Sequence, residues 1–184
     1  KIRALREAKG LSIEELADRS QSSVKTIEQL ESGHLVPSLA PLLKLARGLG
    51  VHLGSLLDDR PHTGPVVVRA RGDADRVVQF SGLSATGHMS TLEFHSLAWN
   101  KENRHMEPFL IDIHPTVEEE CMLSVHEGEE FIYVLAGAIE VTCGEDTYQL
   151  ATGDSIYYDS TVPHEVRATD DADARILAVV YTPV

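Results

Sequence analysis

The spacing of apolar residues changes once along this chain, at a short polar segment between residues 58 and 65. Before that segment, apolar residues recur at the spacing of one face of a helix. After it, they alternate with polar residues in short runs that Gly, Asp and Pro interrupt, which is typical of half-buried strands. The sequence therefore predicts an all-α domain at 1–57, a linker at 58–65 and an all-β domain at 66–184.

The N-terminal pattern contains recognisable helix starts and stops. Ser12 followed by Glu15 forms a capping box, and Ser22 or Ser23 caps the next helix. A glycine such as Gly50 ends a helix readily, because it adopts the left-handed conformation at little cost. We expect five short helices that pack through Leu, Ile and Ala side chains.

The C-terminal pattern predicts many short strands. They are expected near 66–71, 76–80, 90–99, 109–114, 122–125, 129–135, 139–142, 147–150, 155–158, 165–169 and 175–182. Short strands with frequent turns are typical of an antiparallel sandwich or barrel.

The net charge of −13 is unevenly distributed. Residues 1–57 hold eight Lys and Arg against six Asp and Glu, whereas the remainder holds eight against twenty-three. A mildly positive first domain can face phosphates while the acidic domain points away. No stretch is long and apolar enough to cross a bilayer. No secretion leader is seen, and two cysteines in such a chain are more often free, so we expect a cytoplasmic protein without a membrane partner.

Residues 17–31 have the pattern of a helix-turn-helix. Ala17 is the small residue where two helices cross, residues 19–22 form the turn, and 23–31 form the candidate recognition helix. The phrases LSIEELA and TIEQLESG in the run from Leu11 to Leu49 resemble the Cro and lambda-repressor (xenobiotic-response-element) class.

This resemblance implies which side chains face the DNA groove. They are Ser23, Val24, Lys25, Glu28 and Gln29. Lys25 and Gln29 suit phosphate or base edges, whereas Glu28 repels phosphate and would accept a hydrogen bond from a cytosine amine. The alternative is that the fold survives only as a structural or dimerising part.

Three residues of the second domain form a candidate metal site: His126, Glu130 and the distant His164. Two imidazoles and one carboxylate suit Fe(II) with open positions, and equally Zn, Ni, Co or Mn. The alternative is a domain that holds no metal. On alternation, Ile132 and Val134 share the face of Glu130 and give the site an apolar wall.

The second domain resembles the cupin family, which implies a double-stranded β-helix around a metal or ligand site. Glu130 with Gly137 matches the first cupin motif, and Gly153 with His164 matches the second. Ser124 stands where the family has another histidine, so one of the usual four ligands is missing. We expect a small-molecule effector near Ser124, and the other candidate effector contacts are Arg104 and Tyr157.

Three functions fit these patterns. The favoured one is a DNA-binding transcriptional regulator, not an enzyme, whose cupin domain binds an effector and which pairs as a homodimer on a double-stranded operator. The second is a mononuclear Fe(II) oxygenase, since the domain order and ligand spacing also resemble the hydroxypropylphosphonate epoxidases. The third is a metal-free binding module for polyamines or amino acids.

Overall fold

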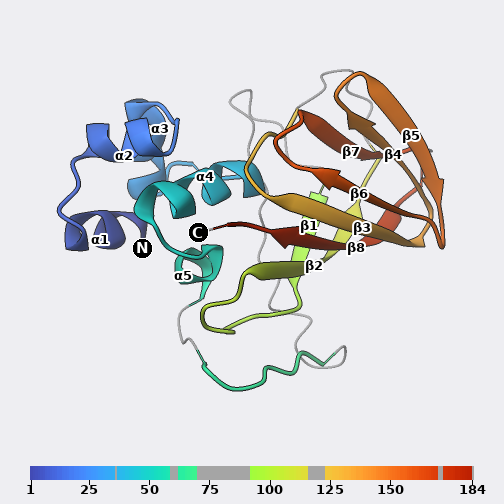
Figure 1. Ribbon diagram of the computed structural model, residues 1–184, viewed down its shortest axis with the longest axis horizontal. Coiled ribbons are helices and arrows are strands. Elements are labelled where there is room, and N and C mark those ends of the chain that lie inside the picture. Colours follow the sequence, from blue (N-terminus) through green and yellow to red (C-terminus); the bar gives the residue numbers. More distant parts are fainter. Residues whose placement is uncertain (36, 59–61, 70–91, 116–122, 170–171, 184) are drawn as a thin grey trace.

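The computed structural model describes residues 1–35, 37–58, 62–69, 92–115, 123–169 and 172–183. Within these residues, five helices come first and eight strands follow. Figure 1 shows the helices gathered at one end of the molecule and the strands forming a barrel-like pair of sheets at the other. The predicted fold class, an α-domain followed by a β-domain of the cupin type, is confirmed.

The helices begin and end where the sequence signals indicate. They are α1 (Ile2–Ala8), α2 (Ile13–Arg19), α3 (Val24–Glu31), α4 (Leu39–Leu49) and α5 (Leu53–Leu57). The capping box of Ser12 and Glu15 is present, and Ser23 caps α3 by accepting a hydrogen bond from the amide of Thr26. Gly50 ends α4 in the left-handed conformation, with a φ of 59°. Apolar side chains of α2, α3 and α4 then close one core.

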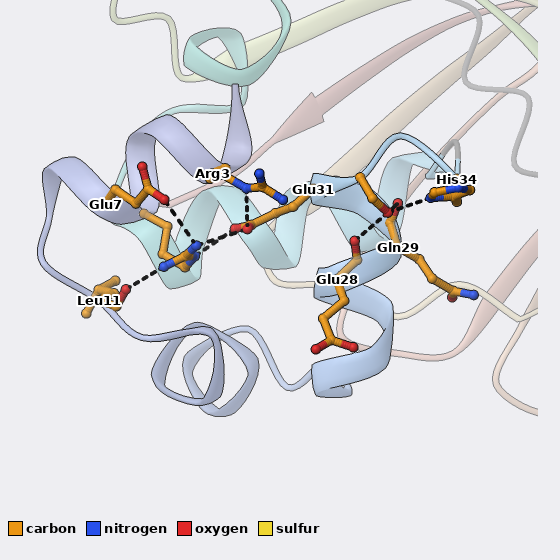
Figure 2. Close-up of polar contacts among 9 residues, drawn as sticks. Arg3, Glu7, Leu11, Glu28, Gln29, Glu31 and His34 are labelled. Carbon is orange, nitrogen blue, oxygen red and sulfur yellow. Dashed lines mark hydrogen bonds and ion pairs between the residues drawn. The ribbon is translucent and has the colours of Figure 1, made fainter.

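A buried ion pair ties α1 to the C-terminal end of α3. The Arg6 guanidinium donates to the Glu31 carboxylate at 2.7 and 3.0 Å and to the carbonyl of Leu11 at 2.8 Å, and Arg3 adds a further contact to Glu31 (Figure 2). The Glu31 side chain is 1% exposed. The hydrogen bond from Arg6, and the weaker one from Arg3, hold the pKa of Glu31 below its ordinary value although burial opposes this.

We therefore expect Glu31→Gln to destabilise the helical domain by about 2 kcal/mol at neutral pH. The buried Arg6 guanidinium would then lack a negatively charged acceptor for its hydrogen bonds. A carboxylate with a lowered pKa stabilises the fold above its unfolded pKa, and this stability is lost as the pH falls through its folded pKa. The difference in the free energy of unfolding between wild type and variant should thus disappear at acidic pH. Chemical denaturation from pH 7 down to 3 measures it. Glu28→Gln is the control, because Glu28 lies on the same helix and has no ion pair with any residue that the structure describes. A pH-independent difference would contradict the assignment.

The strands form two antiparallel sheets. They are β1 (Leu92–Ser96), β2 (Met106–Ile113), β3 (Glu129–Ala136), β4 (Ala138–Cys143), β5 (Asp146–Ala151), β6 (Ser155–Asp159), β7 (His164–Ala168) and β8 (Ala174–Tyr181). The larger sheet has the order β1-β2-β8-β3-β6, and the smaller has the order β5-β4-β7. Because β3 and β4 belong to different sheets, the tight turn at Gly137, with a φ of 75°, carries the chain from one sheet to the other.

Side chains alternate between the barrel interior and its outer surface. Phe109, Ile132, Val134 and Ile176 are buried, with Ile139 facing them from the smaller sheet. The predicted apolar wall beside Glu130 is thereby confirmed.

Three predicted strands differ from the structure or fall outside it. Residues 66–69 are described without strand structure, so the prediction at 66–71 is wrong for that part. Of the strand predicted at 122–125, the structure describes 123–125, and within these Ser124 forms an isolated bridge to His164. The strand predicted at 76–80 lies outside the described residues. Isolated apolar alternation does not form a strand unless a neighbouring strand supplies hydrogen bonds.

A buried charged cluster lies where the helical domain meets the barrel. Arg104, just before β2, donates to the carboxylate of Asp58 and, at 2.7 Å, to that of Glu107. Burial raises the pKa of Glu107 to about 7, against the opposing charge of Arg104. The cluster joins the end of α5 to the start of β2. No helix among the described residues is long and apolar enough to cross a membrane.

Candidate metal centre and nucleic-acid interface

His126, Glu130 and His164 converge inside the barrel from three different segments. His126 precedes β3, Glu130 lies on β3, and His164 begins β7 in the other sheet. The Nε2 atom of His126 is 2.7 Å from Oε1 of Glu130, and Nε2 of His164 is 3.5 Å from the same oxygen. Their exposed fractions are 5%, 8% and 3%. The sequence prediction that these three side chains meet is confirmed.

The backbone holds both histidines at fixed places. The amide of Ser124 donates to the carbonyl of His164 at 2.7 Å, and the amide of His164 donates back at 3.0 Å. Gly128 lies between His126 and Glu130 with a φ of 105°, and a side chain there would collide with the carbonyl oxygen of Tyr181. The turn that aims His126 at Glu130 thus requires glycine at this position.

Both imidazole rings present the same nitrogen to the centre. Nδ1 of His126 contacts the carbonyl oxygen of Glu127 at 3.2 Å, and Nδ1 of His164 contacts that of Val162 at 2.9 Å. A carbonyl oxygen only accepts, so each Nδ1 carries a hydrogen. Each Nε2 is therefore the nitrogen whose lone pair becomes available once its own proton leaves.

Glu130 is the ionised partner in this cluster. Burial opposes its ionisation, but the hydrogen bonds from His126 and His164 outweigh burial and hold the pKa of Glu130 well below its ordinary value. Burial lowers the pKa of His164, yet the Glu130 carboxylate more than offsets this and the net shift is upward. The buried carboxylate thus favours positive charge beside it, whether from protonated imidazoles or from a cation.

This donor set fits a divalent metal ion. One ligand atom from each residue lies within 4.8 Å of the other two, and the three residues are buried. Metal-bound histidines usually donate their other ring nitrogen to a carbonyl or carboxylate, as both do here. His126 Nε2, Glu130 Oε1 and His164 Nε2 are the atoms that would hold the ion, with the remaining positions open to other ligands.

Tyr158 fixes the second oxygen of Glu130. Its hydroxyl donates to Oε2 at 2.7 Å, and its ring lies 5.0 Å from the His164 ring. Burial, followed by the charge of Glu130, raises the pKa of Tyr158 far above its ordinary value, so the hydroxyl keeps its proton. Tyr158 therefore positions the carboxylate so that Oε1 faces the histidines.

Tyr158→Phe should weaken metal affinity about 10- to 100-fold, the usual loss when a partner of a metal ligand is removed. Competition of Zn(II) or Co(II) against a chelating dye measures it. Tyr157→Phe is the matched control, because the neighbouring Tyr157 hydroxyl donates instead to Glu129 on the outer face. Equal affinity of both variants would contradict this positioning role.

The predicted effector contacts do not gather at one place. Ser124 is half-buried beside His164, next to the candidate metal centre. Tyr157 is 62% exposed and its hydroxyl donates to Glu129, whereas the neighbouring Tyr158 is buried and donates to Glu130. The guanidinium of Arg104 pairs with the carboxylates of Asp58 and Glu107 at the domain junction.

The pairing of β3 with β6 distinguishes Tyr158 from Tyr157. In an antiparallel pair, directly opposed residues share a face, and the register pairs Glu130 with Tyr158. That register was not readable from the sequence alone, which left the choice between the two adjacent tyrosines open.

The candidate recognition helix presents a polar outer face. Ser23, Lys25, Glu28 and Gln29 are exposed, and Val24 is 38% exposed. Ile27 and Leu30 on the opposite face are buried. Figure 2 shows the side chains of Glu28 and Gln29 pointing away from Glu31, which anchors the helix to α1. The apolar face of the helix thus packs in the core of the helical domain, while the predicted contact residues remain accessible to solvent.

One family model matches within the helical domain and another matches within the barrel. The model described as a helix-turn-helix matches residues 2–56, and the model described as a cupin domain matches residues 109–180. Among curated proteins, none matches the chain significantly.

Solved structures share the whole domain order. An HTH_3 family transcriptional regulator from Vibrio cholerae has a TM-score of 0.70 at 22% identity, over 100% of this chain and 93% of that chain. Fe(II)-HppE with the alternative substrate (S)-1-HPP has a TM-score of 0.54 at 22% identity, over 98% and 94%. Hydroxypropylphosphonic acid epoxidase from S. wedmorenis has a TM-score of 0.52 at 21% identity, over 98% and 94%. At these identities the likeness concerns the fold.

Proposed function

Because the chain belongs to the proteins that join a helix-turn-helix domain to a cupin domain, we propose that it is a cytoplasmic transcriptional regulator that binds an operator in double-stranded DNA. The observation that carries this proposal is the exposed polar face of α3. The buried Arg6–Glu31 pair joins this helix to α1. A helix held in this way can enter a major groove without leaving its own core.

The contacts follow from the chemistry of each side chain. Gln29 suits the edge of adenine, Lys25 suits a phosphate or a guanine, and Glu28 accepts from a cytosine amine. Ser23 and Val24 lie at the start of the helix, the part that reaches base edges in this motif. As a homodimer, the protein places two such helices one duplex turn apart on a pseudo-palindromic site.

The barrel is the sensor in this proposal. His126, Glu130 and His164 would hold a divalent metal, which would supply a Lewis-acidic point for an effector with oxygen or nitrogen donors. The half-buried Ser124 stands beside His164, where it can contact that effector.

A direct contact links this site to the helical domain. Glu127, the residue after His126, pairs with Arg47 of α4 at 2.6 Å. Helix α4 packs against α2, which precedes the recognition helix. A ligand that shifts the His126 loop therefore acts on the helical domain through this pair, and it changes DNA affinity only as far as it favours one arrangement over another.

Electrophoretic mobility shift with the DNA upstream of the chain's own gene tests this function. At low salt, we expect a sharp shift that weakens steeply as salt rises, because phosphate contacts release counterions. The assay should compare metal-free and metal-loaded protein. Absence of a shift in both forms, with protein shown to be folded, would overturn the proposal.

A metal-dependent oxygenase is the second candidate function. It is favoured by the two-histidine, one-carboxylate donor set, which leaves positions open for substrate and oxygen. Iron-dependent oxygen consumption on addition of a phosphonate would support it, and Glu130→Gln should then abolish the uptake. Consumption equal to that of free iron would remove this candidate.

A further inference from the structure

A cavity of about 140 Å³ lies between the helical domain and the barrel. Its walls come from the end of α2 and the turn after it, from α4, from the His126 loop and from residues 182–183. Figure 1 shows α4 on the side of the helical domain that faces the barrel. No residue of α3 lines the cavity, so it is separate from the face proposed to read DNA.

The charged side chains of the wall are mostly basic. They are Arg19, Lys44, Arg47 and Glu127. Arg47 and Glu127 neutralise each other across the domain boundary at 2.6 Å. Within the described part of the chain, the charged groups of Arg19 and Lys44 have no hydrogen bond or ion pair. Two cations without a counter-ion around one cavity attract an anion.

The remaining wall is partly apolar. Leu43 and Val51 line it from the helical domain, and Val125 lines it from the barrel. A cavity of roughly 150 Å³ holds a benzene-sized guest. A molecule of that size with a short aliphatic body and an acidic group can contact both the apolar and the basic side chains of the wall. A bare inorganic anion contacts only the basic ones.

We infer that this cavity binds a small organic anion, a carboxylate or phosphonate with a short aliphatic body, held by Arg19 and Lys44. Arginine binds such oxygens with two parallel hydrogen bonds, and lysine adds a point charge. Since the ligand contacts α2 and α4 on one side and the His126 loop on the other, it stabilises this arrangement of the two domains relative to any other. Only this effect on DNA affinity rests on the proposed function; the binding itself does not.

Isothermal titration of the full chain tests the site. The probes are butyrate, propylphosphonate, inorganic phosphate and the neutral analogue 1-butanol. We expect saturable binding of at least one organic anion, with weaker binding of phosphate and none of butanol. Arg19→Met and Lys44→Met should each weaken it about tenfold, as expected when one charge-assisted hydrogen bond is lost.

Two controls separate this site from other sources of binding. Arg167→Met removes a guanidinium from an exposed pair with Glu140 on the barrel surface, and it should leave anion affinity unchanged. Titration with and without a chelator separates this site from the candidate metal centre, whose His126 also lines the cavity, and the anion affinity should be the same in both. If the chelator abolished the binding, the anion would be a metal ligand and the inference would fail.

The inference is overturned if neither organic anion binds saturably. It is also overturned if the Arg19→Met/Lys44→Met double variant binds the anion with the affinity of wild type. Tighter binding of butyrate than of propylphosphonate identifies a carboxylate site, and the reverse identifies a phosphonate site. Operator affinity measured with and without saturating anion then tests the coupling. Anion binding by a chain that never binds DNA would support the site and contradict the proposed regulator.

Discussion

Replacement of Glu130 by glutamine should lower the affinity of the chain for a divalent metal at least about a hundredfold. The carboxylate supplies the one negative ligand atom of the centre, and its lowered pKa keeps it ionised. A neutral amide of the same shape still accepts hydrogen bonds from His126 and His164, but it is a poor metal ligand. Removing a direct ligand should cost more than the 10- to 100-fold typical of its hydrogen-bond partners.

Glu129→Gln is the matched control for this experiment, since the adjacent Glu129 carboxylate lies on the outer face beside Tyr157. Zn(II) or Co(II) affinity is measured by competition at constant pH, with thermal melting to confirm that both variants are folded. Affinity should also fall as the pH is lowered, because protons compete for the imidazole nitrogens. Wild-type affinity in Glu130→Gln would show that the metal binds elsewhere.

Combined replacement of Lys25 and Gln29 by alanine should remove specific operator binding. Each base contact contributes about 1–3 kcal/mol of discrimination, so the double variant should bind operator no better than unrelated DNA. If Lys25 contacts a phosphate, its replacement alone should also reduce the salt dependence by about one counterion.

Lys101→Ala, which removes a lysine from the barrel, is the charge-matched control for Lys25. Fluorescence anisotropy with operator and scrambled duplexes at several salt concentrations separates specific from general binding. An operator affinity in the double variant equal to that of wild type would rule out α3 as the reading element.

Local chemistry made the helices predictable. The Ser12–Glu15 capping box and the left-handed Gly50 each involve residues close in sequence, so these helix ends can be predicted without knowing the fold. The same holds for alternation along β3, which correctly assigned Ile132 and Val134 to the barrel interior. The meeting of His164 with Glu130 was predictable only through a motif resemblance, because the two residues lie in different sheets.

Long-range pairing accounts for what the sequence did not reveal. Arg104 pairs with Asp58, a residue 46 positions earlier, and nothing near Arg104 indicates that partner. The choice between Tyr157 and Tyr158 depends on the register between β3 and β6. The cavity between the helical domain and the barrel depends on how the two domains are placed relative to each other. The spacing of apolar residues in the sequence does not predict that placement.

Operator affinity of one preparation of wild-type protein, stripped of metal and then reloaded, tests most directly whether the barrel governs DNA binding. The account predicts that stripping changes the dissociation constant at least about fivefold, the lower end of ordinary coupling between two sites. Reloading should restore it, and Glu130→Gln should respond to neither treatment. Superimposable isotherms for stripped and reloaded wild type would contradict the account.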